Sequence, residues 1–149
     1  MQPMRYYLSL GSNVGNREQT LREALLRIEQ LIGSMDRCSS FFYSAPWGFD
    51  SPNEFCNLCC CVLSDKEPLE VLRLTQAIER ALGRQKKSSI INHQSSIRNY
   101  SDRSIDIDII RVFDNDGNEL FVNHPDLHIP HPLWEQRDFV RIPLAQIMH

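Results

Sequence analysis

Apolar and acidic residues alternate strictly from Ile105 to Ile109, and this pattern constrains the fold more than any other feature of the chain. Successive side chains of a β-strand point to opposite faces, so an alternation of period two indicates a strand with one buried face. We therefore expect a strand over Ser104–Phe113. Its isoleucines face a core, and the carboxylates of Asp106 and Asp108 lie side by side on the other face.

Other segments supply a sheet and helices around this strand. Further strands are expected over Tyr6–Leu10, Cys38–Ser44 and Phe55–Leu63. One helix follows Asn16, a suitable N-cap residue, and stops at Gly33, and a second helix runs from Pro68 to Gly83.

The order β-α-β-β-α-β predicts an α+β, ferredoxin-like fold, in which an antiparallel sheet carries helices on one face. The turn residues Asp114–Gly117 predict that Leu120–Val122 pairs back on the fourth strand as an extra C-terminal hairpin. Residues 84–102 are polar and lack a period, which predicts a long loop, and the proline-rich tail predicts short helices only.

Size and charge exclude several classes of protein. A chain of 149 residues fits a single domain over residues 1–149. The net charge of −3 argues against a general nucleic-acid binder. The N-terminus lacks the pattern of a signal peptide, and no apolar stretch approaches the roughly 20 residues that span a bilayer. We therefore expect a cytoplasmic, monomeric protein without a membrane or nucleic-acid partner.

Five cysteines and a group of histidines raise the question of a zinc or redox site. Cys56 and Cys59 form a C-x-x-C pair, but residues three apart on a strand point to opposite faces. We therefore favour buried thiols that act as small apolar side chains. The segment that holds His124, His128 and His131 is broken by prolines, so a single histidine that contacts phosphate is favoured over zinc.

The acidic strand face suits magnesium, which binds carboxylates together with substrate phosphates. A solvated acidic face is the alternative. Six basic residues against one acidic residue, Asp102, between Arg80 and Arg103 favour a polyphosphate site, because arginine grips phosphate with two donors. The sequence has no P-loop, and the turn Gly11–Gly15 is equally compatible with a tight strand-to-helix turn and with a phosphate contact.

Aromatic residues in or near loops suit a flat heterocycle. Trp47, Phe49, Phe55 and Phe139 lack regular core spacing, and Asn57 shares a strand face with Phe55. Stacking rings with one amide could hold a pterin or purine, although Phe55 and Phe139 are each also compatible with core packing.

These motifs, in this order, resemble those of the 6-hydroxymethyl-7,8-dihydropterin pyrophosphokinase family. The resemblance covers nearly the whole chain. It rests on Leu10–Asn13 (LGSN), Ser44–Gly48 (SAPWG), Phe55-x-Asn57, Ile78–Arg84 (IERALGR), Arg103–Ile109 (RSIDIDI) and Ile129–Leu144 (IPHP, RDFV, PL).

The resemblance implies a magnesium-dependent transfer of pyrophosphate from ATP to the pterin hydroxymethyl group, with release of AMP, in folate biosynthesis. It implies two Mg²⁺ ions on Asp106 and Asp108, with Arg84 and Arg103 as further catalytic residues. The pterin residues it implies are Ser44, Ala45, Trp47, Phe55, Asn57 and Phe139. The ATP residues it implies are Gln76, Glu79, Arg84, Arg103, Ile109, His131 and Arg137.

Some positions depart from the family pattern. Ser101-Asp102 replaces a usual Gly-Pro, Phe55 replaces a frequent tyrosine, and Asp126 and His128 stand where some members have Arg and Thr. Three alternatives remain: a ligand-binding domain without chemistry, a degenerate paralogue, and a nucleotidyltransferase that releases pyrophosphate.

Overall fold

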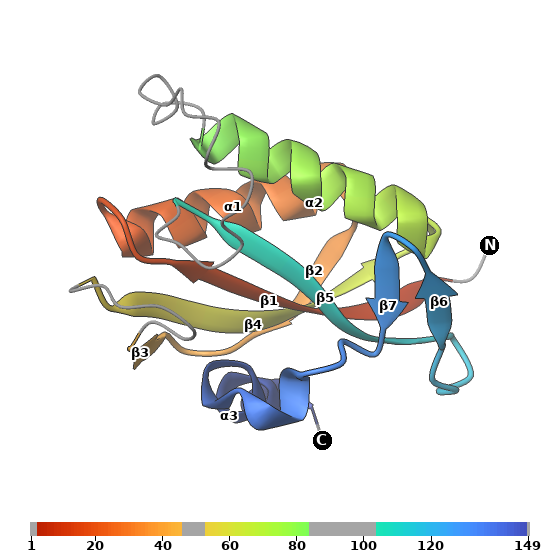
Figure 1. The fold of residues 1–149 in the computed structure, drawn as a ribbon. Coiled ribbons are helices and arrows are strands. Elements are labelled where there is room, and N and C mark those ends of the chain that lie inside the picture. The colour runs from red at the N-terminus through yellow and green to blue at the C-terminus, as the bar shows by residue number, and fades with distance from the viewer. Residues whose placement is uncertain (1–2, 46–52, 84–103, 149) are drawn as a thin grey trace.

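A computed structural model describes residues 3–45, 53–83 and 104–148 of the chain, and Figure 1 shows the arrangement of its elements. It is a mixed α/β fold built on one antiparallel sheet of order β2–β4–β1–β5, in which β3 also pairs with β4. The strands are β1 (Met4–Ser12), β2 (Ser34–Cys38), β3 (Phe42–Ser44), β4 (Phe55–Ser64) and β5 (Asp106–Phe113).

Helices α1 (Arg17–Leu31) and α2 (Pro68–Gly83) lie together on one face of the sheet (Figure 1). Their apolar sides pack against Tyr6, Leu8 and Leu10 of β1 in the main core. The predicted N-cap is confirmed, because the Asn16 side chain accepts a hydrogen bond from the Gln19 N–H at 3.2 Å. The expected bounds of both helices are confirmed to within two residues.

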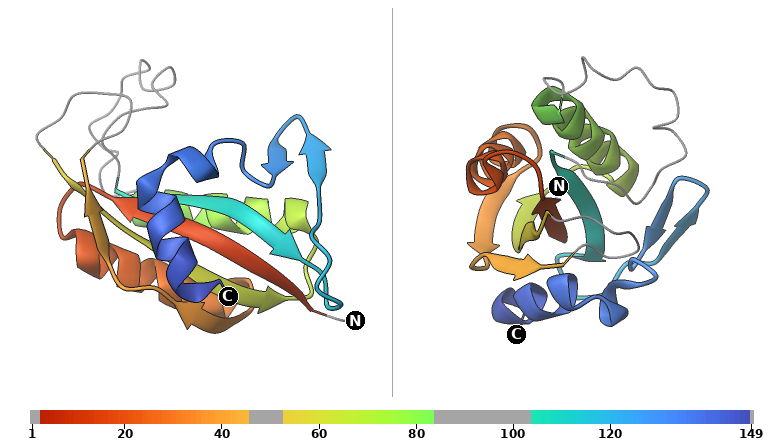
Figure 2. Two further views of the ribbon diagram at one scale, coloured as in Figure 1. Left: turned by 90° about the horizontal axis from the view of Figure 1, so that it is seen from below. Right: turned by 60° about the vertical axis from the view of Figure 1, so that its left-hand side comes forward.

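A third helix, α3 (Asp138–Ile147), covers the opposite face of the sheet after a single 3₁₀ turn, η3 (Trp134–Gln136), as Figure 2 shows. Val140, Leu144 and Ile147 form an apolar stripe that packs on a second core cluster around Ile110. The prediction of helices on one face only is therefore incomplete. Burial of this stripe outweighs the cost of Pro143 inside the helix, about 3 kcal/mol.

The strand expected over Cys38–Ser44 is two short strands, so this prediction is wrong in its bounds. Between them the Ser39 hydroxyl accepts a hydrogen bond from the Cys59 N–H at 3.0 Å, while the Ser39 N–H donates to the Cys59 carbonyl at 2.8 Å. A side-chain oxygen thus replaces a backbone acceptor, and regular pairing resumes at Phe42.

Strand β5 has the two faces that its alternation predicts. Ile105, Ile107 and Ile109 are each no more than 5% exposed and belong to the core under α1 and α2. Its pairing with β1 shifts by one residue, from Ile109 opposite Leu8 to Arg111 opposite Tyr7. This bulge leaves Ile110 unpaired and turns Ile110 toward the α3 side.

The outer edge of β5 is covered by other parts of the described chain. The Ile107 N–H donates to Glu79 Oε2 at 2.7 Å. The carbonyl of Ile110 accepts from the His131 N–H, and that of Val112 accepts from the Leu120 N–H, both at 2.8 Å. These bonds satisfy backbone groups of β5 that no other strand among the described residues reaches.

The turn after β5 forms at the predicted residues. Asp114 Oδ1 accepts from the N–H groups of Asp116 and Asn118, both at 2.9 Å, and Gly117 has φ of +88°. The returning chain meets β5 at an isolated bridge, Phe113–Glu119, instead of forming a strand over Leu120–Val122. The following strands, β6 (Val122–His124) and β7 (Leu127–Ile129), pair with each other.

All five cysteines are free thiols. Cys56 lies in the core under α1 and α2, whereas Cys59 lies in the cluster under α3, so the two point to opposite faces as predicted. Burial raises the pKa of the Cys59 thiol to about 12. These thiols therefore act as small apolar side chains. Within the described ranges, no helix is long and apolar enough to cross a bilayer.

Candidate active site

The two aspartates lie at the start of β5 on the face turned away from α1 and α2. Asp106 lies opposite Gly11 of β1, and Asp108 lies opposite Ser9. Directly opposed residues share a sheet face, so the two carboxylates border a strip of β1 that carries only a hydrogen and a hydroxymethyl group. Both aspartates are half-buried, and the fixed backbone of the strand sets their spacing.

Negative charge is crowded at this position. The pKa of Asp108 is raised well above its usual value, first because the carboxyl is desolvated and then because Asp106 and Glu79 lie nearby. The guanidinium of Arg137 acts in the opposite direction. A cation bound here would relieve the repulsion, which is the electrostatic condition that a metal or a basic side chain can meet.

Phe55 and Asn57 of β4 lie beside this strip of β1, on the side away from the aspartates. Asn57 lies opposite Gly11. A Cβ at Gly11 would lie 3.0 Å from Asn57 Oδ1 and 3.5 Å from Phe55 Cδ1. The glycine therefore makes room for an amide and an aromatic ring on the same face as the two carboxylates.

Hydrogen bonds fix the amide of Asn57. Its Nδ2 donates to the Phe42 carbonyl and to Ser44 Oγ, both at 2.9 Å, and the residue is 3% exposed. The structure thus joins three of the predicted pterin residues, Ser44, Asn57 and Phe55. Ala45 is exposed beyond β3, and Trp47 lies outside the described residues.

The segment that enters α3 brings a second group of predicted residues toward the aspartates. The Arg137 guanidinium carbon lies 5.7 Å from the Phe139 ring centroid. The pKa of His131 is lowered, first by burial and then by Arg137, while Asp106 acts to raise it. His131, Arg137 and the two aspartates therefore share one electrostatic environment.

The remaining predicted ATP residues differ in burial, and two of them lie outside the described residues. Gln76 is exposed on α2, and Glu79, one turn later, is half-buried and accepts the Ile107 N–H. Ile109 is 4% exposed in the core, so a contact with ATP would have to come from its backbone. Arg84 and Arg103 lie outside the described residues, as does most of the basic cluster.

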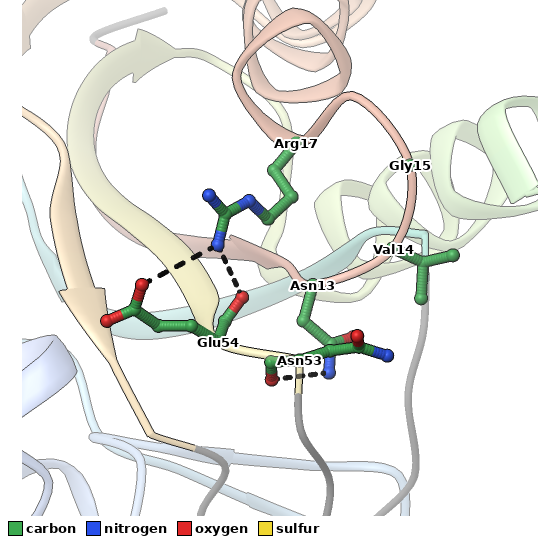
Figure 3. Close-up of a pocket in the computed structure, with 6 residues that line it drawn as sticks. All are labelled: Asn13, Val14, Gly15, Arg17, Asn53 and Glu54. Atoms are coloured by element: carbon green, nitrogen blue, oxygen red, sulfur yellow. Dashed lines mark hydrogen bonds and ion pairs between the residues drawn. The ribbon is translucent and has the colours of Figure 1, made fainter.

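A hollow of about 420 Å³ lies beyond Gly11, at the turn between β1 and α1 (Figure 3). Asn13 donates to the Asn53 carbonyl at 3.3 Å, and Arg17 donates to the Glu54 carbonyl at 2.7 Å. In Figure 3 these side chains bridge the turn and the start of β4. Neither Asn13 nor Arg17 was among the predicted site residues, although Asn13 belongs to the LGSN motif and both lie in or beside the Gly/Asn-rich turn.

The donor set beside β5 fits magnesium better than zinc. In the part of the chain that the structure describes, no three His, Cys, Asp or Glu side chains gather as a metal site. Two carboxylates alone leave most positions around an ion to water and substrate oxygens, which is the usual environment of Mg²⁺ in nucleotide sites. The residues present therefore fit a metal that arrives with a polyphosphate.

Comparisons with known proteins place the chain among folate enzymes. The family model of 7,8-dihydro-6-hydroxymethylpterin-pyrophosphokinase matches residues 7–149. A 2-amino-4-hydroxy-6-hydroxymethyldihydropteridine pyrophosphokinase of Porphyromonas gingivalis is 42% identical over 143 residues, covering 95% of this chain and 88% of the relative. The protein of that name in Bacillus subtilis is 33% identical, covering 95% of this chain and 76% of its own length.

A solved structure has a similar fold. The crystal structure of an HPPK-DHPS protein in complex with substrates superposes with a TM-score of 0.68 at 13% identity. The match covers 99% of this chain and 40% of the other, so the fold recurs there as one part of a longer protein.

Proposed function

The chain belongs to the 7,8-dihydro-6-hydroxymethylpterin-pyrophosphokinase family, and we propose that its reaction takes place beside the two carboxylates of β5. The enzyme transfers pyrophosphate from ATP to the hydroxymethyl group of 6-hydroxymethyl-7,8-dihydropterin and releases AMP, a step of folate synthesis. The observation that carries the location is the row Asp106–Gly11–Asn57 across three strands on one face.

We propose that the pterin binds over Gly11. Phe55 comes from β4 and Phe139 from α3, and each half-buried ring offers a flat apolar surface to the pterin. The amide of Asn57, already fixed by two hydrogen bonds, reads the ring edge together with Ser44, Ala45 and Trp47. A fixed amide loses little conformational freedom on binding, which favours affinity.

ATP then lies between the carboxylates and the basic side chains. Arg137 acts electrostatically on Asp108, and Asp106 acts on His131. The proposed set also includes Gln76, Glu79, Ile109, Arg84 and Arg103. The hydroxymethyl oxygen attacks the β-phosphorus and the bond to AMP breaks, so the chain contributes mainly by orienting the two substrates and by placing positive charge at the phosphates.

We propose that Asp106 and Asp108 hold magnesium, two ions in all. Bound magnesium supplies positive charge to the phosphate oxygens. Support comes from the crowding that raises the pKa of Asp108 and from the position of the two carboxylates on one face of β5, opposite Gly11 and Ser9.

A product analysis tests the proposal. The protein is incubated with ATP and the hydroxymethyl dihydropterin, with Mg²⁺ or with EDTA, and AMP, ADP and free pyrophosphate are quantified. AMP that requires both the pterin and Mg²⁺ supports it. Pyrophosphate without a pterin product would indicate a nucleotidyltransferase, and binding without AMP would indicate a sensor.

We also infer that the strand order β2–β4–β1–β5, with α1 and α2 on one face, corresponds to the ferredoxin-like arrangement, which β3, β6, β7 and α3 extend. The single domain over residues 1–149, the monomeric state and the cytoplasmic location stay predictions. Sedimentation of the purified protein tests the second of them.

A further inference from the structure

Arg111 of β5 contacts four side chains, and none of them belongs to the proposed catalytic or binding residues. Its Nε and Nη2 donate to the two carboxylate oxygens of Glu119 at 2.9 and 2.8 Å. Its Nη1 lies 3.5 Å from the Met148 sulfur. Its guanidinium carbon lies 5.1 Å from the ring centroid of Phe113 and 5.3 Å from that of Trp134.

The bulge in β5 gives Arg111 this position. Because the register shifts after Ile109, Arg111 lies opposite Tyr7, whose side chain belongs to the cluster under α3. The side chain of Arg111 is 23% exposed and that of Glu119 is 18% exposed. A largely shielded, bidentate pair between two rings has a better defined geometry than the exposed ion pairs of this protein.

The contacts of Arg111 bracket the segment that carries proposed substrate residues. Trp134 begins η3 and Met148 follows α3, so Arg137 and Phe139 lie between the two contacts. Just before Trp134, the His131 N–H is bonded to the Ile110 carbonyl of β5. The segment is therefore fastened to the same strand that carries Asp106 and Asp108.

We propose that Arg111 is a positioning residue for the reaction: by holding Trp134 and Met148 it keeps Arg137 and Phe139 at the substrate-binding face. This inference rests on the proposed function of those two residues. Loosening the segment lowers the fraction of molecules that can bind, so substrate affinity falls while the chemical step on the bound substrates is preserved.

The test compares Arg111→Met with Arg141→Met. Arg141 pairs with Asp138 on the exposed side of α3. Its replacement therefore removes the same charge from the same region but leaves the contacts of Arg111 with Trp134 and Met148 in place. We expect Arg111→Met to raise the KM for the pterin about tenfold with kcat within about threefold of the parent. Arg141→Met should leave both constants within about twofold. Arg111→Lys, which keeps the charge but loses the flat two-donor fork, should lie between them.

Hydrogen exchange supplies a readout that a general loss of stability would not give. In Arg111→Met, amides over residues 131–148 should exchange faster, while those of β1 and β4 keep their rates. Equal KM values in Arg111→Met and the parent, a fall in kcat alone, or faster exchange across the whole sheet would each overturn the proposal. If the parent protein makes no pterin-dependent AMP, the proposed function fails instead, and the exchange pattern still shows whether Arg111 holds the segment.

Discussion

Asp108 lies where a negative charge is unfavourable for the folded protein. Its raised pKa means that the ionised carboxylate destabilises the fold at neutral pH unless a cation is bound. We predict that Asp108→Asn lowers the rate of AMP formation by about 10²–10³-fold, because one of the two carboxylates proposed to hold magnesium is lost. The same variant should unfold at a higher temperature than the parent in metal-free buffer.

Asp116→Asn is the matched control for Asp108→Asn, because Asp116 is exposed in the turn after β5. It makes the same change of charge and should alter neither the rate nor the melting temperature in metal-free buffer. A normal rate in Asp108→Asn would contradict the role of this carboxylate.

Gly11 leaves space for the side chains of Asn57 and Phe55, so a substitution there acts directly on the proposed pterin site. Its backbone φ is not positive, so an alanine would add only the contacts of its Cβ, at 3.0 Å from Asn57 Oδ1 and 3.5 Å from the Phe55 ring. Because Asn57 is held by two hydrogen bonds, it cannot move away cheaply. We predict that Gly11→Ala raises the pterin KM about tenfold, an effect of about 1.4 kcal/mol. Gly83→Ala, whose Cβ would meet nothing closer than 4.0 Å, should keep the parent KM in the same steady-state assay.

At the scale of elements, the Arg111–Glu119 pair connects β5 to the chain beyond its turn. The pKa of Glu119 is lowered from 4.5, first by the hydrogen bond from Arg111. A lowered folded pKa contributes stability that is complete above about 4.5, the pKa of the unfolded chain, and that is lost as the pH falls through the folded value. We predict that Glu119→Gln lowers the free energy of unfolding by about 1 kcal/mol at pH 7.

Urea unfolding between pH 7 and pH 3 checks this prediction for Glu119. The difference between Glu119→Gln and the parent should shrink below pH 4.5. Glu23→Gln, which removes an exposed pair with Arg27 at 4.0 Å on α1, should differ little from the parent at any pH. A difference that grows toward acid pH would contradict the assignment.

The elements that sequence predicted well are those with one dominant period. The alternation around Asp106 fixes which side chains of β5 are buried, and the cap at Asn16 and the glycine at position 33 mark the ends of α1. The break between β2 and β3 depends on a hydrogen bond from Cys59 to a distant hydroxyl, Ser39, and no local pattern encodes it. The bulge at Ile110 was missed because Ile109 and Ile110 are both apolar and satisfy either register.

At the scale of the whole molecule, the sheet is covered on both faces, and this was not predicted. The proline-rich tail was expected to form short helices, and the ten-residue α3 agrees with this. Its docking on the second face of the sheet depends on the apolar stripe of α3 meeting the cluster around Ile110, which no local pattern encodes. For the candidate site, sequence predicted the residue types and their order along the chain. The proximity of Arg137 to Asp108 depends on how α3 docks, so it required the fold.

The reactivity of the cysteine thiols tests whether both faces of the sheet are covered by helices. Cys38 is exposed, whereas Cys56, Cys59, Cys60 and Cys61 are fully buried in β4 between the two helical layers. We predict that a chromogenic disulfide reagent at pH 8 modifies one thiol of the native protein rapidly and all five in denaturant. Cys38→Ser should abolish the rapid reaction. Two or more rapid thiols in the native protein would show that β4 is accessible.

The covered edge of β5 has a consequence for how this enzyme can be studied. An uncovered edge strand invites pairing with a second molecule and thereby aggregation. Here Glu79 and the backbone of His131 occupy that edge, and both residues also belong to the proposed ATP site. Glu79→Ala would therefore remove a proposed substrate contact and also expose the edge of β5 to aggregation. A loss of activity in this variant could not be assigned to either cause. Glu79→Gln keeps an oxygen acceptor for the Ile107 N–H and removes only the charge, so it separates catalysis from self-association.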